Sequence, residues 1–414
     1  MIMMNYKIDN MDWGEIIQLP SSRALRSTAH IIGGRYPCRS VAYVPRLILN
    51  EFNDAKKINV LDPFMGSGTT AVETISRRFN SFGLEVDPFA RLITEVSTHG
   101  FTDGERNEIE RIHNIISEKF PNCQPKEIFA PKTKNIEYWF DDVNFNDLLK
   151  LKTLIHELAN EKSVKRFFLA VLADIIRAAS KAERQSLKPY ISKKYIKTRN
   201  EVFPTYIKAF KNYFNAIHTE SEFQGGTAVN WINGDATSFK TRTKMDVAIT
   251  SPPYINAMDY VRCIKLESAW IGTGDDDIFS DVRKKQLGEQ ARTKLAIPNS
   301  LVNEIASPHL SYLEKQDNPR FKTALSYFQD MHDNLVCVNS ALKKGALYHV
   351  IIGNSVIRSK EVETHKIIAD LSEELGYKWD GYFCYPIKDH RTSLPRNGNG
   401  GKISVEHVIS LRKL

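Results

Sequence analysis

The stretch that decides the fold reads Ile58-Asn59-Val60-Leu61-Asp62-Pro63-Phe64-Met65-Gly66-Ser67-Gly68-Thr69-Thr70. It opens with a short apolar, β-branched run that stops at Asp-Pro, which predicts a buried strand with an abrupt end. Two glycines follow, and residues 69–79 have the hydrophobic period of a helix. Residues 81–86 predict a second strand. Strand, glycine turn, helix and strand in this order open a doubly wound α/β fold.

The rest of the chain combines further strands with one long helical stretch. Residues 104–222 are mostly helical. Strands are then predicted at 228–232, 245–250, 346–352, 377–385 and 405–411, helices at 323–342 and 361–375, and an irregular stretch at 272–320. We therefore predict a mostly parallel, Rossmann-like α/β sheet domain formed by residues 20–104 and 225–414, with a large helical insertion at 105–224.

Composition narrows the class of protein. The chain has 414 residues, 42% of them hydrophobic, which is enough for a sizeable core. No apolar run approaches the roughly 20 residues that span a bilayer, and the N-terminus lacks the pattern of a signal peptide. Five widely spaced cysteines form no CxxC pair, so neither a disulfide framework nor a zinc site is expected. These features predict a cytoplasmic protein that has no metal and does not enter a membrane.

Positive charge gathers in one part of the helical insertion. The net charge of the chain is only +8, but Glu183 is the one acid between residues 176 and 200. Tyr190 and Tyr195 lie among the basic residues there, as in surfaces that contact phosphates and stack on bases. A solvated helix face is the alternative. The candidate nucleic-acid contacts in this segment are Arg184, Lys188, Lys193, Lys194 and Lys197. Two more, Arg391 and Arg396, lie in a Gly- and Asn-rich stretch, for which a plain surface loop is the alternative.

The glycine turn has the properties of a ligand site. Gly66 and Gly68 let the backbone approach a ligand, and the helix that follows offers free N–H groups at its positive end. No Gly-Lys-Ser/Thr follows, which excludes a Walker motif. The third glycine of a dinucleotide fingerprint is also missing, since Thr70 and Ala71 stand there. Carboxylates, phosphates and dinucleotides all use such turns, so the turn alone leaves the ligand open.

Acidic residues at the predicted strand ends favour S-adenosylmethionine over NAD. Asp62 ends the first strand, where it can accept hydrogen bonds from an ammonium group. Glu85 ends the second strand, where an acid usually binds ribose hydroxyls. An ammonium, a carboxylate and a ribose together describe S-adenosylmethionine. Asp235, at the third strand end, is placed to accept from an adenine amino group, and capping a helix is its alternative role.

A second short motif, Thr250-Ser251-Pro252-Pro253-Tyr254, follows the strand predicted at 245–250. Two prolines make this turn stiff and leave backbone carbonyls available as acceptors. If the Ser251 hydroxyl and the Pro252 carbonyl each accept one N–H, an amino nitrogen can direct its lone pair at a methyl donor. Tyr254 offers a face on which an extruded base could stack. A tight turn without catalytic function is the alternative.

Both motifs resemble those of the DNA amino-methyltransferases, which make N4-methylcytosine or N6-methyladenine. Their cofactor motif has the form D-P-F-x-G-S-G-T-T and their catalytic motif S/D/N-P-P-Y/F/W, and this chain matches both residue for residue. The stretch 30–45 looks like a looser version of the element that closes over the cofactor's methionine end. The resemblance covers the sheet domain and not the helical insertion. It implies S-adenosylmethionine as cofactor, bound by Asp62, Phe64, Gly66, Gly68, Thr69, Thr70, Glu85 and Asp235, with catalysis by Ser251, Pro252, Pro253 and Tyr254.

The resemblance also suggests the substrate. Serine in the first catalytic position favours cytosine N4 in double-stranded DNA over adenine N6. The helical insertion at 105–224 is then the first candidate for target recognition, and residues 265–325 are the second. Any restriction endonuclease partner would be a separate chain. The alternatives are an N6-adenine enzyme, an RNA enzyme of the tRNA guanine-N2 type, and a non-catalytic nucleic-acid-binding module.

Overall fold

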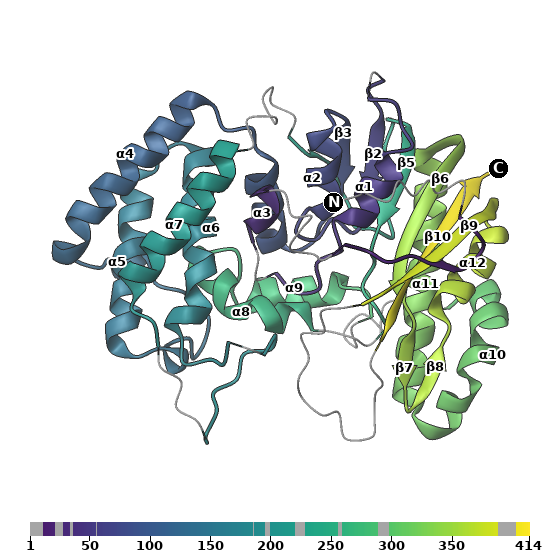
Figure 1. Cartoon of the computed structure of the whole chain (residues 1–414). Helices are drawn as coiled ribbons and strands as arrows, with labels where there is room; N and C mark the ends of the chain where they lie inside the picture. The colour runs from purple at the N-terminus through teal and green to yellow at the C-terminus, as the bar shows by residue number, and fades with distance from the viewer. Residues whose placement is uncertain are drawn as a thin grey trace.

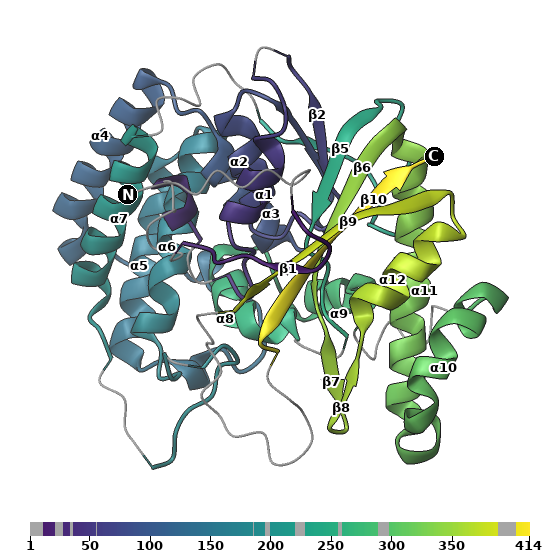
Figure 2. The same cartoon turned by 45° about the vertical axis from the view of Figure 1, so that its right-hand side comes forward.

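The computed structural model describes residues 11–20, 28–33, 36–54, 56–184, 186–194, 199–219, 228–255, 259–288, 298–387 and 403–414. Figures 1 and 2 show two parts side by side, a central sheet with its covering helices and a bundle of helices next to it. The sheet part is formed by both ends of the chain and the bundle by its middle.

The described part of the sheet has eight strands, in the order β1-β9-β10-β6-β5-β2-β3-β4. All neighbouring strands run parallel except β10, which is antiparallel to both β6 and β9. The strands are β1 (Glu15–Ile16), β2 (Asn59–Asp62), β3 (Asn80–Gly83), β4 (Asn230–Trp231), β5 (Met245–Thr250), β6 (Leu342–Gly353), β9 (Tyr377–Pro386) and β10 (Val405–Lys413). The predicted doubly wound, mostly parallel α/β sheet is confirmed. β1 lies before residue 20, where the predicted sheet domain begins.

The order of the strands determines where a ligand can bind. The chain builds outward from β2 through β3 to β4, then returns to the other side of β2 with β5. In an open α/β sheet, ligands bind outside the carboxyl ends of the strands at the point where the direction of winding reverses. Here that point lies between β2 and β5, whose carboxyl ends carry the glycine turn and the Ser-Pro-Pro-Tyr turn.

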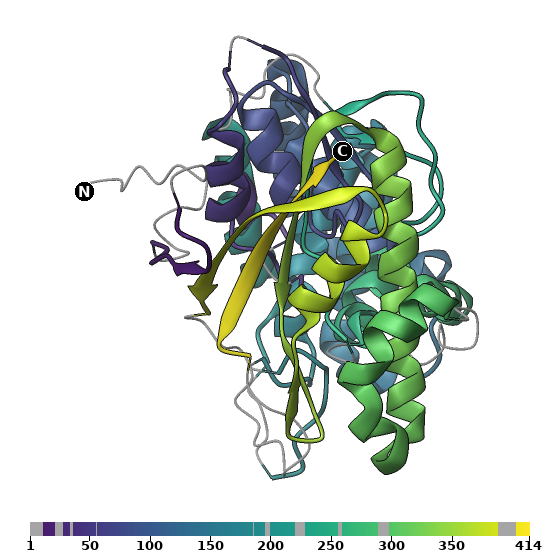
Figure 3. The same ribbon diagram turned by 90° about the vertical axis from the view of Figure 1, so that its right-hand side faces the viewer.

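Helices cover both faces of the sheet, as the side view shows (Figure 3). Alternate residues of β2 and β5 face opposite sides: Val60 and Val247 pack with the helix at 43–49, whereas Leu61 and Ala248 pack with the helices at 318–341 and 364–373. The helices around the sheet are α1 (Tyr43–Leu49), α2 (Thr69–Ser76), α3 (Pro88–Thr98), α8 (Tyr260–Ile271), α9 (Asp276–Lys285), α10 (Ser300–Gln316), α11 (Asn318–Ala341) and α12 (Thr364–Glu373).

The helical insertion contributes most of a large buried core. Its helices are α4 (Asp103–Lys119), α5 (Asp142–Leu158), α6 (Lys162–Ala179) and α7 (Val202–Thr219). Phe167, Leu148 and Tyr206 are fully buried between them. The same core continues into Trp270 of α8. Arg177 of α6 also forms a buried ion pair with Glu267 of α8, with 3.2 Å between Arg177 Nε and Glu267 Oε1. Phe89 and Ile93 of α3 belong to this core too, so the insertion is joined to the sheet part through both α3 and α8.

Two sequence predictions in the second half of the chain were wrong. The stretch 272–320, predicted as irregular, contains the helices α9 and α10. The acidic run at its start is a helix N-terminus, where the Asp275 carboxylate accepts from the backbone N–H of Ile278. Pro308 lies inside α10 and obscured the helical pattern. The helix predicted from residue 361 begins at Thr364, because the hairpin of β7 (Ser355–Ile357) and β8 (Lys360–Val362) precedes it.

Candidate active site

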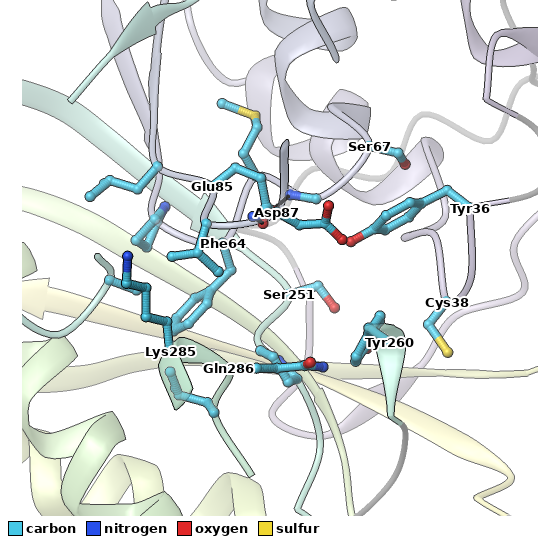
Figure 4. Close-up of a pocket in the computed structure, with 18 of the residues that line it drawn as sticks. Tyr36, Cys38, Phe64, Ser67, Glu85, Asp87, Ser251, Tyr260, Lys285 and Gln286 are labelled. Carbon is cyan, nitrogen blue, oxygen red and sulfur yellow. Dashed lines mark hydrogen bonds between the residues drawn. The ribbon is translucent and has the colours of Figure 1, made fainter. Parts of the chain in front are cut away.

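A pocket opens at the carboxyl ends of β2, β3 and β5 (Figure 4). Its empty volume is about 860 Å³, including the part open to solvent. Its walls come from the glycine turn, the end of β3, Asp235 and Ala236, and the Ser-Pro-Pro-Tyr turn. The other wall residues are Tyr36, Cys38, Arg39, Ser40, Tyr260, Val282, Lys285, Gln286 and Leu287. Both motifs singled out from the sequence thus face one cavity.

The glycine turn depends on its two glycines. Gly66 and Gly68 have φ angles of 53° and 80°, in the left-handed region that side chains disfavour. A Cβ added at Gly68 would lie 2.8 Å from the Thr94 side chain of α3. The Thr94 hydroxyl in turn donates to the Gly66 carbonyl over 3.0 Å. The turn is therefore shaped by its sequence and held by α3, with the N-terminus of α2 immediately behind it.

Glu85, just beyond the end of β3, lines this pocket beside the glycine turn. Its Oε2 accepts from the Gly66 N–H over 2.7 Å, and its Oε1 accepts from the Asp87 N–H over 2.8 Å. Each carboxylate oxygen has a second lone pair, so Glu85 can still accept from a ligand hydroxyl. Burial and the nearby Asp87 carboxylate raise the pKa of Glu85 to about 7.

Asp62 lies behind the pocket and joins the two motifs. It is buried, and its Oδ1 accepts from the Thr250 hydroxyl over 2.6 Å and from the Phe64 N–H over 3.0 Å. Thr250 is the last residue of β5, directly before Ser251. Burial raises the pKa of Asp62 to about 6. Asp62 is therefore placed to align the ends of β2 and β5, and it is not among the residues that line the pocket.

The other proposed cofactor contacts fall into two groups. Phe64, Thr69 and Asp235 line the pocket, whereas Gly68 and Thr70 lie just outside its wall. The Oδ1 of Asp235 accepts from the N–H and the hydroxyl of Thr237, over 2.8 and 2.7 Å. Asp235 thus caps a turn, and no helix follows it.

The Ser-Pro-Pro-Tyr turn divides between the pocket and the sheet. Ser251 and Pro253 line the pocket, and Figure 4 shows the Ser251 side chain on the same cavity as Tyr260 and Gln286. Pro252 is buried. Tyr254 is not among the residues that line the pocket, and its hydroxyl donates to Glu406 of β10.

Several wall residues were not identified as individual contacts from the sequence. Tyr36 is almost fully buried, and its ring centroid lies 6.5 Å from that of Tyr260 and 6.3 Å from that of Phe89. It belongs to the stretch 30–45, which the resemblance had suggested as a cover. Lys285 and Gln286 reach the pocket from the end of α9. Nothing in their local sequence marks them, since they join the site only through the fold.

The described part of the basic segment lies on the surface. Arg184, Lys188, Lys193 and Lys194 are exposed, and Arg184 also donates to Asn200. The base of the segment is attached to α8, because Arg177 donates to the Cys263 carbonyl over 2.7 Å. Lys197, Arg391 and Arg396 lie outside the described residues.

Two kinds of feature are absent from the ranges that the structure describes. These ranges bring no three His, Cys, Asp or Glu side chains together in a way that could hold a metal ion. They also include no helix long and apolar enough to cross a membrane.

Comparison with known proteins adds relatives for most of the chain. No protein-family model matches it. The chain is 20% identical over 339 residues to the Type II methyltransferase M.MvaI of Kocuria varians, covering 75% of this chain and 73% of the relative. It is 23% identical over 408 residues to the Type II methyltransferase M.AvaI of Nostoc sp., covering 90% and 84%. It is 26% identical over 267 residues to the Type II methyltransferase M.BsoBI of Geobacillus stearothermophilus, covering 58% and 52%.

Solved structures are more distant. TrmN from Thermus thermophilus and the rRNA methyltransferase AviRa from Streptomyces viridochromogenes both align at 10% identity, with TM-scores of 0.29 and 0.34. The alignments cover 94% of this chain and 52% of TrmN, and 96% of this chain and 94% of AviRa. Such scores are too low to establish a likeness in detail, and the strand order alone carries the fold. The sequence relatives support a DNA methyltransferase, and its methyl donor is S-adenosylmethionine.

Proposed function

We propose that the protein transfers a methyl group to the exocyclic N4 of cytosine at a specific site in double-stranded DNA. One observation carries the proposal: Ser251 faces the same pocket as Gly66 and Glu85. An amino group held at Ser251 would therefore lie beside a cofactor held by the glycine turn. Because an exocyclic amine cannot reach such a pocket from within a duplex, the cytosine must be flipped out of the helix.

The pocket fits S-adenosylmethionine by the chemistry of its walls. We assign the amino-acid end of the cofactor to the glycine turn, where the α2 N-terminus at Thr69 favours a carboxylate. Glu85 would accept from the ribose hydroxyls, and Asp235 from the adenine amino group. Phe64 contributes apolar wall. Asp62 and Thr70 support the turn from behind. Bound in this way, the cofactor supplies an electrophilic methyl group.

Ser251 and Pro252 prepare the amine for attack. The Ser251 hydroxyl oxygen and the Pro252 carbonyl each accept one N–H, so that the nitrogen becomes tetrahedral and its lone pair points towards the methyl group. Transfer would then be a direct in-line displacement, helped mainly by positioning: the N–CH3 bond would form as the S–CH3 bond breaks, the neutral thioether would leave, and the surplus proton of the amine would pass to water. Pro252 and Pro253 keep the turn stiff, and the Tyr254 ring stacks on the flipped base. The choice of cytosine follows from the resemblance, in which serine favours N4.

The helical part, residues 105–224, is our candidate for target recognition. Its exposed lysines follow Arg177, which is fastened to α8 next to the catalytic turn. DNA contacted by Lys188, Lys193 and Lys194 would thus lie on the substrate side of the molecule. The Type II names of the relatives fit a separately encoded restriction endonuclease as the biological partner.

Labelled S-adenosylmethionine decides among these assignments. The protein is incubated with unmodified bacteriophage DNA and, separately, with total RNA, and the nucleosides are resolved after digestion, with Ser251→Ala as control. We expect label in N4-methylcytosine. Label in N6-methyladenine would move the target to adenine, and label in RNA alone would refute a DNA substrate. Cofactor binding without any transfer would favour a non-catalytic module.

A further inference from the structure

The tyrosine of the catalytic turn is fastened to the far side of the site. Tyr254 donates its hydroxyl hydrogen bond to Oε1 of Glu406, the second residue of β10. Glu406 lies directly opposite Gly353, the last residue of β6, in the antiparallel ladder. A residue far along the chain thus determines where the end of the Ser-Pro-Pro-Tyr motif points.

Gly353 makes this contact sterically feasible. A Cβ added there would lie 3.0 Å from Cε2 and 3.3 Å from Cζ of Tyr254. The tyrosine ring therefore packs over the bare backbone of Gly353, and its hydroxyl reaches the next strand. The ring is held at two places, by packing at Gly353 and by the hydrogen bond at Glu406.

The hydrogen bond is of a strong kind. Burial, followed by the Glu406 charge, raises the pKa of Tyr254 well above its ordinary value, so the hydroxyl remains a proton donor. A bond from a neutral hydroxyl to a carboxylate is roughly twice as strong as one between neutral groups. Glu406 therefore restricts rotation of the Tyr254 side chain more than packing alone would.

We propose that Glu406 is a positioning residue for the target base. It holds the Tyr254 ring at the orientation in which a flipped base stacks on it, before DNA arrives, so that no side-chain freedom is lost on binding. The inference rests on the proposed function, in which Tyr254 is the stacking surface. It adds that this surface is fixed by contacts with β6 and β10 and not by the catalytic turn itself.

Variants of Glu406 and Tyr254 test the inference, with methyl transfer to unmodified bacteriophage DNA measured at saturating S-adenosylmethionine. Glu406→Ala and Tyr254→Phe should each lower kcat by about tenfold, the usual effect of losing a hydrogen bond to a charged group. The Kd for S-adenosylmethionine should stay within about twofold. Adding Glu406→Ala to Tyr254→Phe should cause no further loss, since both remove the same bond. Glu406→Gln, whose amide oxygen still accepts, should restore most of kcat.

A matched control lies one residue along the same strand. His407 is hydrogen-bonded to the Tyr382 hydroxyl over 2.8 Å and points to the opposite face of the sheet from Glu406. Tyr382→Phe removes this bond without touching the catalytic turn and should leave kcat unchanged.

The outcomes separate the inference from the proposed function. If Tyr254→Ala loses turnover while Glu406→Ala and Tyr254→Phe do not, the stacking role stands and the role of Glu406 is refuted. If Glu406→Ala lowers kcat by the same factor in the wild type and in Tyr254→Phe, the role of Glu406 is also refuted. Full turnover in Tyr254→Ala would refute the stacking role itself, and the inference with it.

Discussion

At the scale of single residues, Ser251 is the group whose loss should separate binding from transfer. It faces the pocket, whereas the contacts that shape the cofactor turn are made by Gly66, Glu85 and Asp62. We therefore expect Ser251→Ala to bind S-adenosylmethionine with unchanged Kd and to lose turnover by about 100-fold, as when one hydrogen bond to the reacting group is removed. Isothermal titration and a methyl-transfer assay measure the two quantities. Unchanged turnover would remove Ser251 from the mechanism.

The raised pKa of Glu85 predicts how cofactor binding depends on pH. With a pKa of about 7, the Glu85 carboxyl is ionised at pH 8 and mostly protonated at pH 6. Because a protonated carboxyl accepts less well from ribose hydroxyls, the Kd for S-adenosylmethionine should rise by about tenfold as the pH falls from 8 to 6. Glu85→Gln should bind weakly at both values. A wild-type Kd that is constant over this range would contradict the assignment of Glu85 to the ribose.

Protonation of Glu85 has the opposite effect on the stability of the cofactor-free protein: it weakens cofactor binding but stabilises the fold. The folded-state pKa of Glu85 is raised above the ordinary value of 4.5, so the folded protein holds the proton more tightly than the unfolded chain. The stabilisation is therefore complete below pH 4.5 and is lost as the pH rises through 7.

Residues of the site differ in how visible they were in the sequence. The places of Gly66, Glu85 and Ser251 on the pocket wall could be predicted because each belongs to a local motif at a strand end. The contact of Asp62 with Thr250 could not, since it joins strands that are distant in the sequence. This contact is a physical reason for the glycine turn and the Ser-Pro-Pro-Tyr turn to occur together, because it fixes the position of one relative to the other.

At the scale of elements, the contribution of the buried ion pair between α6 and α8 to stability can be measured. The Arg177 and Glu267 side chains are only 5% and 3% exposed. Removing one partner therefore leaves the other as a buried, unpaired charge. We expect Arg177→Met to lower the free energy of unfolding by about 3–5 kcal/mol, measured by urea denaturation. Replacing both residues, Arg177→Met with Glu267→Leu, should recover most of that loss.

A surface pair serves as the control for this experiment. Arg111 and Glu108 form an exposed ion pair on α4, 2.7 Å apart. Arg111→Met should leave the unfolding curve almost unchanged. An equal loss from both arginine variants would show that burial does not determine the effect at Arg177.

The sheet was more predictable than the elements between β5 and β6. Strands such as β2 and β5 are short apolar runs, and their identity follows from local sequence. The helices α9 and α10 do not show in this way, because Pro308 and an acidic N-terminus imitate a loop. The hairpin of β7 and β8 depends on positive φ angles at Arg358 and Ser359, which are uncommon for these residue types.

At the scale of the whole molecule, the surface charge predicts how DNA binding responds to salt. Replacing Lys188, Lys193 and Lys194 by glutamine should reduce the slope of log K against log salt by about 0.9 for each phosphate that these lysines neutralise. Fluorescence anisotropy with a labelled duplex at several salt concentrations measures the slope. A slope equal to that of the wild type would leave this segment as a solvated face.

A control set is available at the opposite end of the strands. Lys343, Lys344 and Lys378 are exposed at the amino ends of β6 and β9, away from the catalytic turn. Their replacement should leave the slope unchanged. A similar drop in both triple variants would indicate a general effect of net charge.

The two edges of the sheet have a further consequence. In the described part of the sheet, the outermost strands, β1 and β4, are only two residues long each. An edge strand with a long row of unpaired N–H and C=O groups is a template on which other chains can assemble. β1 covers the ten-residue β9 only at Phe383 and Cys384, so most of β9 has no neighbouring strand on that side among the described residues. That side of β9 is therefore the place on the described sheet where another chain could most readily add a strand.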